Sequence, residues 1–246
     1  PVSAMTKAVF FDVDFTLIYP GPAFQGEGYQ AFCARHGMDV DPRRFAAAVN
    51  SASHILDREQ DAVYDPQIFI DYTAHVIRQM GGTGGAVDAC AAEMYREWAA
   101  CQHFLLYDDV PAGLHALAER DIRLGLISNS HRCLDSFQEH FELEGFIDVA
   151  ISSSQHGYMK PHRSIFEAAL KLAGVSPSEA IMVGDSLVQD IEGARRVGMR
   201  GVLVRRSESS AEPPIADVPV IRRLLELPAM LHPGGQLKGR PASRCK

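Results

Sequence analysis

Residues 8–16, with the sequence AVFFDVDFT, pass directly from four apolar residues into two closely spaced aspartates. An apolar run of this length, rich in valine and phenylalanine, predicts a buried β-strand. Similar runs recur at 122–127, 149–151, 180–183 and 201–204. From residue 112 onward, helical patterns alternate with these runs, at 112–119, 134–144, 164–173 and 187–197. Strands that alternate with helices indicate a parallel sheet covered by helices on both faces, so we predict an α/β fold.

Residues 20–106 interrupt this alternation. Four helical patterns and no strand pattern occur there, at 23–36, 42–56, 66–80 and 86–101. We therefore expect a small all-helical domain inserted after the first strand, where it would lie over the edge of the sheet and act as a lid. The α/β core domain would then comprise residues 7–19 and 107–231. The polar, glycine-containing stretch 232–246 is expected to be a disordered tail.

The composition of the 246-residue chain bears on its partners and its location. Its formal net charge is −7 and no basic stripe offsets this charge, so nucleic acid is not expected as the main partner. No stretch approaches the roughly 20 apolar residues that a membrane helix requires. The first residues hold no apolar signal core, so we expect no membrane association and a cytoplasmic location. The sequence carries no signal for the oligomeric state.

Asp12 and Asp14 lie directly beyond the first predicted strand. A carboxylate at a strand end can attack phosphorus and form an acyl phosphate, a role open to Asp12. The second carboxylate, Asp14, can donate a proton to the leaving oxygen and then take one from the hydrolytic water. Two close carboxylates also repel, which favours a protonated acid or a bound cation. A turn in which both aspartates only cap backbone groups would explain the same residues.

Two further segments supply groups that suit a phosphate. Ser128 and Asn129 follow a predicted strand, where a hydroxyl and backbone amides are placed to bind a phosphoryl oxygen. The ammonium group of Lys160 would neutralise both a carboxylate nucleophile and a phosphate. Taken alone, an ordinary strand-end turn or a solvated surface lysine would account for each segment.

Gly184, Asp185 and Ser186 directly follow another predicted strand. Glycine allows another group to approach the backbone closely, and Asp185 supplies the hard oxygen ligand that Mg²⁺ prefers. Ser186 and Gln189 fit a capping box for the following helix, whose first turn would contain Asp190. A well-capped helix with an acid in its first turn would explain this segment without a metal.

All four polar segments either end a predicted strand or lie on the loop beyond one. Ligands of parallel α/β sheets bind outside the carboxyl ends of the strands. Four such segments on one sheet edge arise by accident far less often than any one of them, so the conjunction favours a catalytic site. In the order of these segments the chain resembles the haloacid-dehalogenase (HAD) superfamily of hydrolases, in the subfamily I branch that has a helical C1-type cap after the first strand. The resemblance extends from about Lys7 to Leu231.

The resemblance implies a Rossmann-like parallel sheet with the Asp12 strand at its centre. Asp12 would be the nucleophile and Asp14 the general acid and base. Lys160 would stabilise the phosphoryl intermediate. The residues that would bind or orient the phosphoryl group are Thr16, Ser128, Asn129 through its backbone, and Lys160.

The resemblance also implies a magnesium cofactor. Its ligands would be Asp12, the backbone carbonyl of Asp14, and Asp185. Ser186 and Asp190 would support these ligands, Asp190 either by pairing with Lys160 or through water. Many members of the family have glycine where this chain has Phe15, a difference that we expect to affect local flexibility rather than activity.

The family covers several reactions, and we predict a Mg²⁺-dependent phosphohydrolase that acts on a small phosphorylated metabolite through an aspartyl phosphate. True 2-haloacid dehalogenases do not need the second acid, so Asp14 favours phosphoryl chemistry. Phosphonoacetaldehyde-type hydrolases use a cap lysine, and no lysine occurs between Lys7 and Lys160. A sugar-phosphate mutase and a non-catalytic binding module stay open as alternatives. The substrate is not identified; candidate specificity residues of the cap are Tyr19, Phe24, Gln25, Tyr29 and the loop 81–85.

Overall fold

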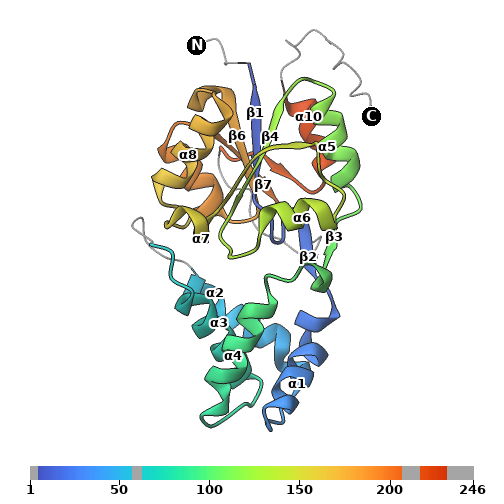
Figure 1. Ribbon diagram of the computed structural model, residues 1–246, viewed down its shortest axis with the longest axis vertical. Helices are drawn as coiled ribbons and strands as arrows, with labels where there is room; N and C mark the ends of the chain where they lie inside the picture. The colour runs from blue at the N-terminus through green and yellow to red at the C-terminus, as the bar shows by residue number, and fades with distance from the viewer. Residues whose placement is uncertain (1–4, 57–62, 207–216, 232–246) are drawn as a thin grey trace.

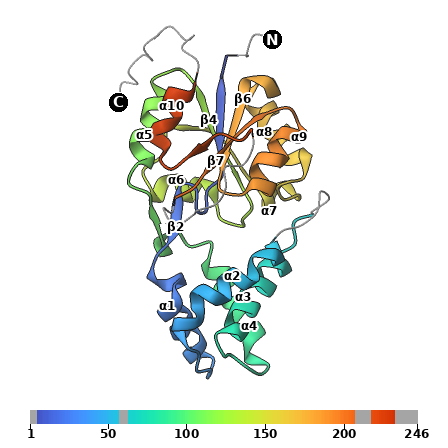
Figure 2. The ribbon, with the colours of Figure 1, turned by 180° about the vertical axis from the view of Figure 1, so that it is seen from behind.

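The computed structural model describes residues 5–56, 63–206 and 217–231 (Figure 1). The tail expected at 232–246 lies outside these residues. A sheet flanked by helices occupies one end of the molecule, and a further group of helices occupies the other end (Figures 1 and 2). None of the helices in the described ranges has the length and hydropathy that a membrane span requires.

Six parallel strands form the sheet in the described part of the chain, in the order β5-β4-β1-β6-β7-β8. Their bounds are β1 Ala8–Phe11, β4 Arg123–Ser128, β5 Ile147–Ser152, β6 Ala180–Gly184, β7 Arg200–Val204 and β8 Val220–Ile221. The apolar runs predict five of these strands, and the predicted α/β fold with a Rossmann-like parallel sheet is confirmed. The two residues of β8 are too few to show a pattern. β1 pairs with β4 and β6, so the strand that leads to Asp12 is central, as the resemblance implies.

Both faces of the sheet are covered. Val9 and Phe11 of β1 belong to one hydrophobic core, whereas Ala8 and Phe10 belong to another. Successive side chains of a strand point to opposite faces, so this division places one core on each side of the sheet. Of the helices that flank the sheet, those that pack in the first core are α5 Val110–Ala118, α6 Leu134–His140 and α10 Leu227–Met230, and those that pack in the second are α8 Arg163–Ala173 and α9 Gly193–Arg196. A further short helix, α7 Ser153–His156, follows β5.

The helix predicted at 187–197 is not uniform. Leu187–Glu192 form a π-helical turn, and the α-helical conformation of α9 begins only after it. The backbone N–H groups of Asp190 and Ile191 both donate to the carbonyl of Ser186, at 3.1 and 3.3 Å, which widens the turn. π-Helical turns are rare in proteins, and many of those that occur lie at functional sites. The prediction of one continuous helix is therefore wrong in its first half.

Four helices occupy most of the stretch predicted as an all-helical insert: α1 Gly26–Arg35, α2 Phe45–Leu56, α3 Gln67–Gln79 and α4 Ala86–Glu97. They correspond to the four helical patterns in the sequence. The carboxyl ends of the sheet strands point toward these helices (Figure 1). The amphipathic patterns therefore identify the helices, and the chain places them at the sheet edge where the polar segments lie.

The expectation of no strand in residues 20–106 is wrong at its end. β3 Phe104–Leu106 pairs antiparallel with β2 Ile18–Pro20. Strands of three residues are too short to show an alternating pattern. The ribbon joins the two segments that connect the sheet to the four helices, and the rings of Tyr19 and Tyr107 pack beside it with centroids 4.8 Å apart.

Candidate active site

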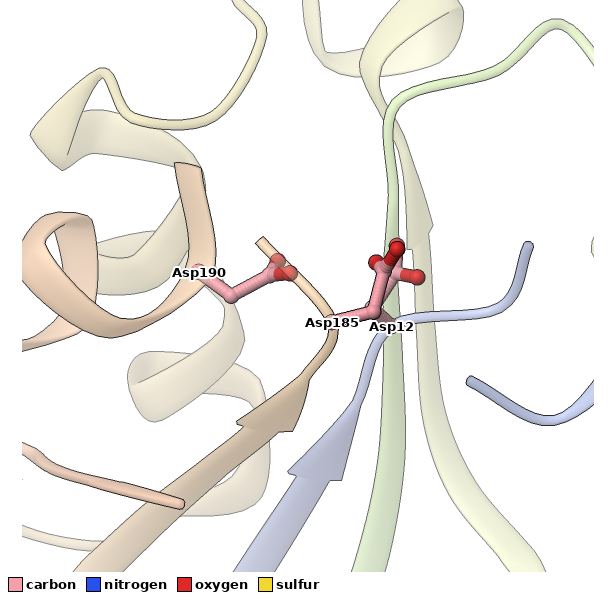
Figure 3. Close-up of side chains that lie close together, drawn as sticks. All are labelled: Asp12, Asp185 and Asp190. Atoms are coloured by element: carbon pink, nitrogen blue, oxygen red, sulfur yellow. The ribbon is translucent and has the colours of Figure 1, made fainter. Parts of the chain in front are cut away.

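Three aspartates from different elements converge at the carboxyl edge of the sheet (Figure 3). Asp12 follows β1, Asp185 follows β6, and Asp190 lies in the π-helical turn. One carboxylate oxygen of each lies within 4.8 Å of the other two. β1 and β6 are neighbouring parallel strands in which Phe11 is paired with Val183. Their carboxyl ends therefore bring Asp12 and Asp185 side by side.

Lys160 bridges two of these carboxylates. Its Nζ donates to Oδ1 of Asp12 and to Oδ1 of Asp190, both at 2.7 Å, and its side chain is 1% exposed. Burial alone would lower the pKa of Lys160, but attraction by Asp12 and Asp190 outweighs burial and raises the pKa above its ordinary value. The ammonium group is therefore charged. Its pairing with Asp190 corresponds to one of the two roles that the resemblance implies for Asp190.

The cluster carries more negative charge than Lys160 neutralises. Burial, followed by repulsion from Asp12 and Asp190, raises the pKa of Asp185 well above its ordinary value. Burial also raises the pKa of Asp190 to about 6, against the attraction of Lys160. A divalent cation between the carboxylates would offset this repulsion, and carboxylate oxygens are ligands that Mg²⁺ prefers. The donor set therefore fits a magnesium ion.

Asp14 is held by a residue that the sequence analysis did not single out. Nη1 of Arg132 donates to both carboxylate oxygens of Asp14, at 3.0 and 3.1 Å. Burial raises the pKa of Asp14 and repulsion from Asp12 adds to this effect, whereas Arg132 opposes both. Arg132 lies on the loop after β4, and that position beyond a strand end is the only signal that could have identified it. The pairing itself depends on the path of the loop.

Asn129 fixes the backbone around Lys160. Its Nδ2 donates to the carbonyl of Lys160 at 2.9 Å and to Oε1 of Gln189 at 3.1 Å, and its Oδ1 accepts the N–H of Lys160 at 2.7 Å. Leaving such backbone groups unpaired in a buried site is costly, so the bonds specify one position of the lysine. The side chain of Asn129 thus positions Lys160.

Two side chains predicted to bind phosphate, Thr16 and Ser128, are fully buried and are not among the described residues that line the cavity of the site. Oγ1 of Thr16 has no hydrogen-bond partner among the described residues, whereas its carbonyl accepts from Arg206 at 2.6 Å. The hydroxyl of Ser128 is hydrogen bonded to the hydroxyl of Ser130 at 2.9 Å, and Ser130 does line the cavity.

Ser186 caps the π-helical turn, but the predicted capping box is only half present. Oγ of Ser186 accepts the N–H of Gln189 at 3.1 Å. The N–H of Ser186 donates to Oδ2 of Asp190 at 3.0 Å, rather than to the side chain of Gln189, which donates to the carbonyl of Leu56. A Cβ atom at Gly184 would collide with the carboxylate of Asp190. Glycine therefore permits the close approach that the sequence predicts for this position.

A cavity of about 530 Å³ lies in front of the carboxylates. Asp12, Asp14 and Asp185 contribute to it from the sheet edge, and each of the helices α1 to α4 contributes residues from the other side. Among the predicted specificity residues, Phe24 and Tyr29 line this cavity. The described lining residues do not include Tyr19, Gln25 or the loop 81–85.

Comparison with known proteins identifies the family. A family model described as haloacid dehalogenase-like hydrolase matches residues 6–198. The chain therefore belongs to the haloacid dehalogenase-like hydrolases, and the resemblance drawn from its four polar segments is confirmed. The protein is an enzyme of the hydrolase class.

Two curated proteins and one solved structure are similar over most of the chain. The chain is 29% identical over 219 residues to the ribulose-1,5-bisphosphate 5-phosphatase of Halopiger xanaduensis, covering 87% of this chain and 90% of that protein. It is 28% identical over 237 residues to the N-acylneuraminate-9-phosphatase of Mus musculus, covering 92% and 94%. The crystal structure of a HAD phosphatase from Thermococcus onnurineus matches with a TM-score of 0.63 and 25% identity, covering 95% of this chain and all of that one.

Proposed function

We propose that the protein is a Mg²⁺-dependent phosphohydrolase that cleaves a small phosphate monoester through a phosphorylated Asp12. The observation that carries this proposal is a pair of contacts facing one cavity: Lys160 holds Asp12 at 2.7 Å, and Arg132 holds Asp14 at 3.0 Å. The two curated relatives are named as phosphatases of small phosphorylated compounds, which supports the same chemistry.

In the first step, a carboxylate oxygen of Asp12 attacks phosphorus, and the bond between phosphorus and the ester oxygen breaks. Oδ1 of Asp12 accepts from Lys160, so we assign the attack to Oδ2. Asp14, protonated, donates its proton to the ester oxygen, which leaves as an alcohol. Arg132 then stabilises the carboxylate that remains on Asp14.

In the second step, the carboxylate of Asp14 takes a proton from a water molecule, and the water oxygen attacks the phosphorus of the aspartyl phosphate. The bond between phosphorus and Asp12 breaks, and inorganic phosphate leaves. Lys160 compensates the negative charge that returns to Asp12. Both carboxyl groups are then in their starting states.

The phosphoryl oxygens are assigned to the loop 128–130, where Asn129 and Ser130 line the cavity. Ser128 supports this loop through its hydrogen bond to Ser130, and the role predicted for Thr16 stays a proposal without a contact at the cavity. The groups that would hold Mg²⁺ are Asp12, Asp185 and the backbone carbonyl of Asp14. Ser186 and Asp190 would support these ligands. When bound, the ion would supply positive charge between the phosphate and the carboxylates.

We further propose that residues 20–106 form a cap domain and that residues 7–19 and 107–231 form the catalytic core. Both parts contribute walls to the cavity, which supports a lid that excludes water from the aspartyl phosphate until hydrolysis. The Asp14–Arg132 pair favours hydrolysis of a phosphate ester over dehalogenation, because dehalogenation does not require a second acid.

The deciding experiment measures phosphate release from para-nitrophenyl phosphate, with Mg²⁺ and with a chelator, for the wild type and Asp12→Asn. We expect Mg²⁺-dependent release that falls at least about a thousandfold in the variant. Asp71→Asn, at an exposed position of α3, is the matched control and should retain activity. Unchanged turnover in Asp12→Asn would overturn the nucleophile assignment. No release by the folded wild type would favour a mutase or a binding module.

A further inference from the structure

The wall of the cavity that faces the carboxylates is aromatic. Residues of α1, α3 and α4, of the segment just after α4, and of the loop after β1 contribute to it, among them Phe15, Tyr29, Phe69, Tyr72, Tyr95 and Trp98. Aromatic rings stack on flat apolar ligand surfaces and gain little from contact with charged groups of negative sign. The phosphate end of the substrate lies at the sheet edge, so this wall faces the leaving group of the ester. The wall therefore determines which leaving groups are accepted.

The described residues that line the cavity include no lysine and no arginine. Lys160 and Arg132 are paired with aspartates and have side chains that are 1% exposed, and Arg205 donates to the backbone carbonyl of Asp185 at 2.6 Å. His131 also lines the cavity, but burial lowers its pKa and keeps the imidazole neutral. A carboxylate or second phosphate on the leaving group would lose its hydration here without gaining a partner.

Two hydroxyl groups on this wall are hydrogen bonded to protein groups. Oγ1 of Thr73 donates to the carbonyl of Phe69 at 2.9 Å. The hydroxyl of Tyr95 is hydrogen bonded to that of Tyr64. These two hydroxyls are therefore less available to a sugar-like leaving group, for which Nε2 of His131, without a partner among the described residues, would supply one hydrogen bond and leave the other hydroxyls of the ligand unpaired.

Phe15 places an aromatic ring in the cavity from a backbone position that favours glycine. Its φ is +63°, in the left-handed region that bulky side chains rarely adopt. Its side chain is 44% exposed, and its ring centroid lies 6.4 Å from that of Trp98. An exposed ring on a strained backbone contributes little to folding, so its place at the cavity points to contact with a ligand.

We propose that the substrate is a phosphate monoester whose leaving group is uncharged and presents an aromatic or similarly flat apolar face to Phe15 and Trp98. This substrate class presupposes the phosphohydrolase function proposed above. The ester oxygen would lie toward Asp14, and the ring of the leaving group would lie against the aromatic wall that includes Phe15 and Trp98. A cavity of about 530 Å³ has the size of a site for a small molecule.

Two matched pairs of esters test this proposal. In the first pair, 4-(carbamoylmethyl)phenyl phosphate and 4-(carboxymethyl)phenyl phosphate differ by one charge at similar size. In the second pair, benzyl phosphate and glucose 6-phosphate are both esters of primary alcohols, one aromatic and one rich in hydroxyls. We expect kcat/KM to be at least about tenfold higher for the neutral and for the aromatic member.

Equal values or the reverse order, in an enzyme that releases phosphate, would overturn the proposed substrate class while leaving the phosphohydrolase function intact. No release from any ester, para-nitrophenyl phosphate included, would instead overturn the phosphohydrolase function and the substrate class with it. The two failures are therefore distinguishable.

Two variants assign the selectivity to the cavity wall. Phe15→Gly suits the left-handed φ, so the variant should fold at least as stably as the wild type while its preference for benzyl over glucose 6-phosphate falls about fivefold or more. Asn50→Arg adds a cation at an exposed lining position and should raise the relative kcat/KM of the carboxymethyl ester, whereas the uncharged control Asn50→Gln should not. Unchanged ratios in both Phe15→Gly and Asn50→Arg would overturn the proposal.

Discussion

Arg132 donates to both carboxylate oxygens of Asp14, at 3.0 and 3.1 Å, although 118 residues separate the two in the chain. The other end of the guanidinium group donates to the carbonyl of Trp98 at 2.8 Å, and its carbon lies 4.4 Å from the centre of the Phe104 ring. Trp98 and Phe104 belong to the segment that leads from α4 back to the sheet. The proposed general acid is thus oriented by an arginine that is anchored to the helical insert.

Breaking this pair should cost stability. Arg132→Met would leave the partly exposed carboxyl group of Asp14 without its partner, and we expect the free energy of unfolding to fall by about 1–3 kcal/mol. Urea unfolding followed by circular dichroism measures the change. The double variant Arg132→Met with Asp14→Asn, which removes both charges, should recover part of the loss. A single variant as stable as the wild type would show that the contact contributes nothing to the fold.

Replacing the proposed acid should affect poor leaving groups most. Asp14→Asn cannot donate a proton to the ester oxygen, so hydrolysis of alkyl phosphates should slow by about 10²–10⁴-fold. A nitrophenyl ester needs less protonation to leave, and its loss should be smaller. The ratio of kcat/KM for the two esters, in wild type and variant, is the measurement. Equal losses for both would exclude an acid role for Asp14 and leave it a purely structural partner of Arg132.

The sheet was predictable because its strands bury both faces. All five residues of β6 are buried, so its sequence is a continuous apolar run that no amphipathic helix would show. Asp12 and Asp185 were predictable for the same reason, since parallel strands deliver the residues that follow them to one edge. β8 and the β2–β3 ribbon were missed because strands of two or three residues are too short to show an alternating hydrophobic pattern.

The contacts made by loops could not be predicted. Arg132 meets Asp14, and Asn129 encloses the backbone of Lys160, only because the loop after β4 folds across the sheet edge. The π-helical turn depends on the bond between Asp190 and Ser186, which the helical pattern does not reveal. Sequence periodicity reports burial of a face, whereas these contacts depend on which loops meet in space.

The metal ligands can be separated by titration. Asp185 is proposed as a ligand, whereas Asp190 is bonded to Lys160 and to the N–H of Ser186. We expect Asp185→Asn to raise the Mg²⁺ concentration for half-maximal activity at least about tenfold. Asp190→Asn should lower turnover by releasing Lys160, with a much smaller change in that concentration. Equal shifts in both variants would mean that Asp190 also binds the ion directly. If Asp185→Asn required the same Mg²⁺ concentration for half-maximal activity as the wild type, Asp185 would be excluded as a ligand.

His131 should make stability depend on pH. Burial lowers the pKa of its imidazole in the folded protein, and its ring is stacked on Tyr95 with centroids 4.1 Å apart. In the unfolded chain the imidazole has its ordinary pKa of about 6.5. Below that pH the unfolded state binds a proton that the folded state does not bind, so folding stability falls as the pH falls, by at most about 1.4 kcal/mol per pH unit.

The wild type should therefore lose more stability between pH 7.5 and pH 5 than His131→Gln, which carries no titratable group at this position. Urea midpoints at the two pH values measure the difference, and the other histidines cancel because both proteins contain them. If both proteins lost the same amount, the imidazole would have to take up its proton equally well in the folded protein. His131 would then supply a positive charge to the cavity below pH 6.5, and esters with an acidic leaving group would be hydrolysed better there than at pH 7.5.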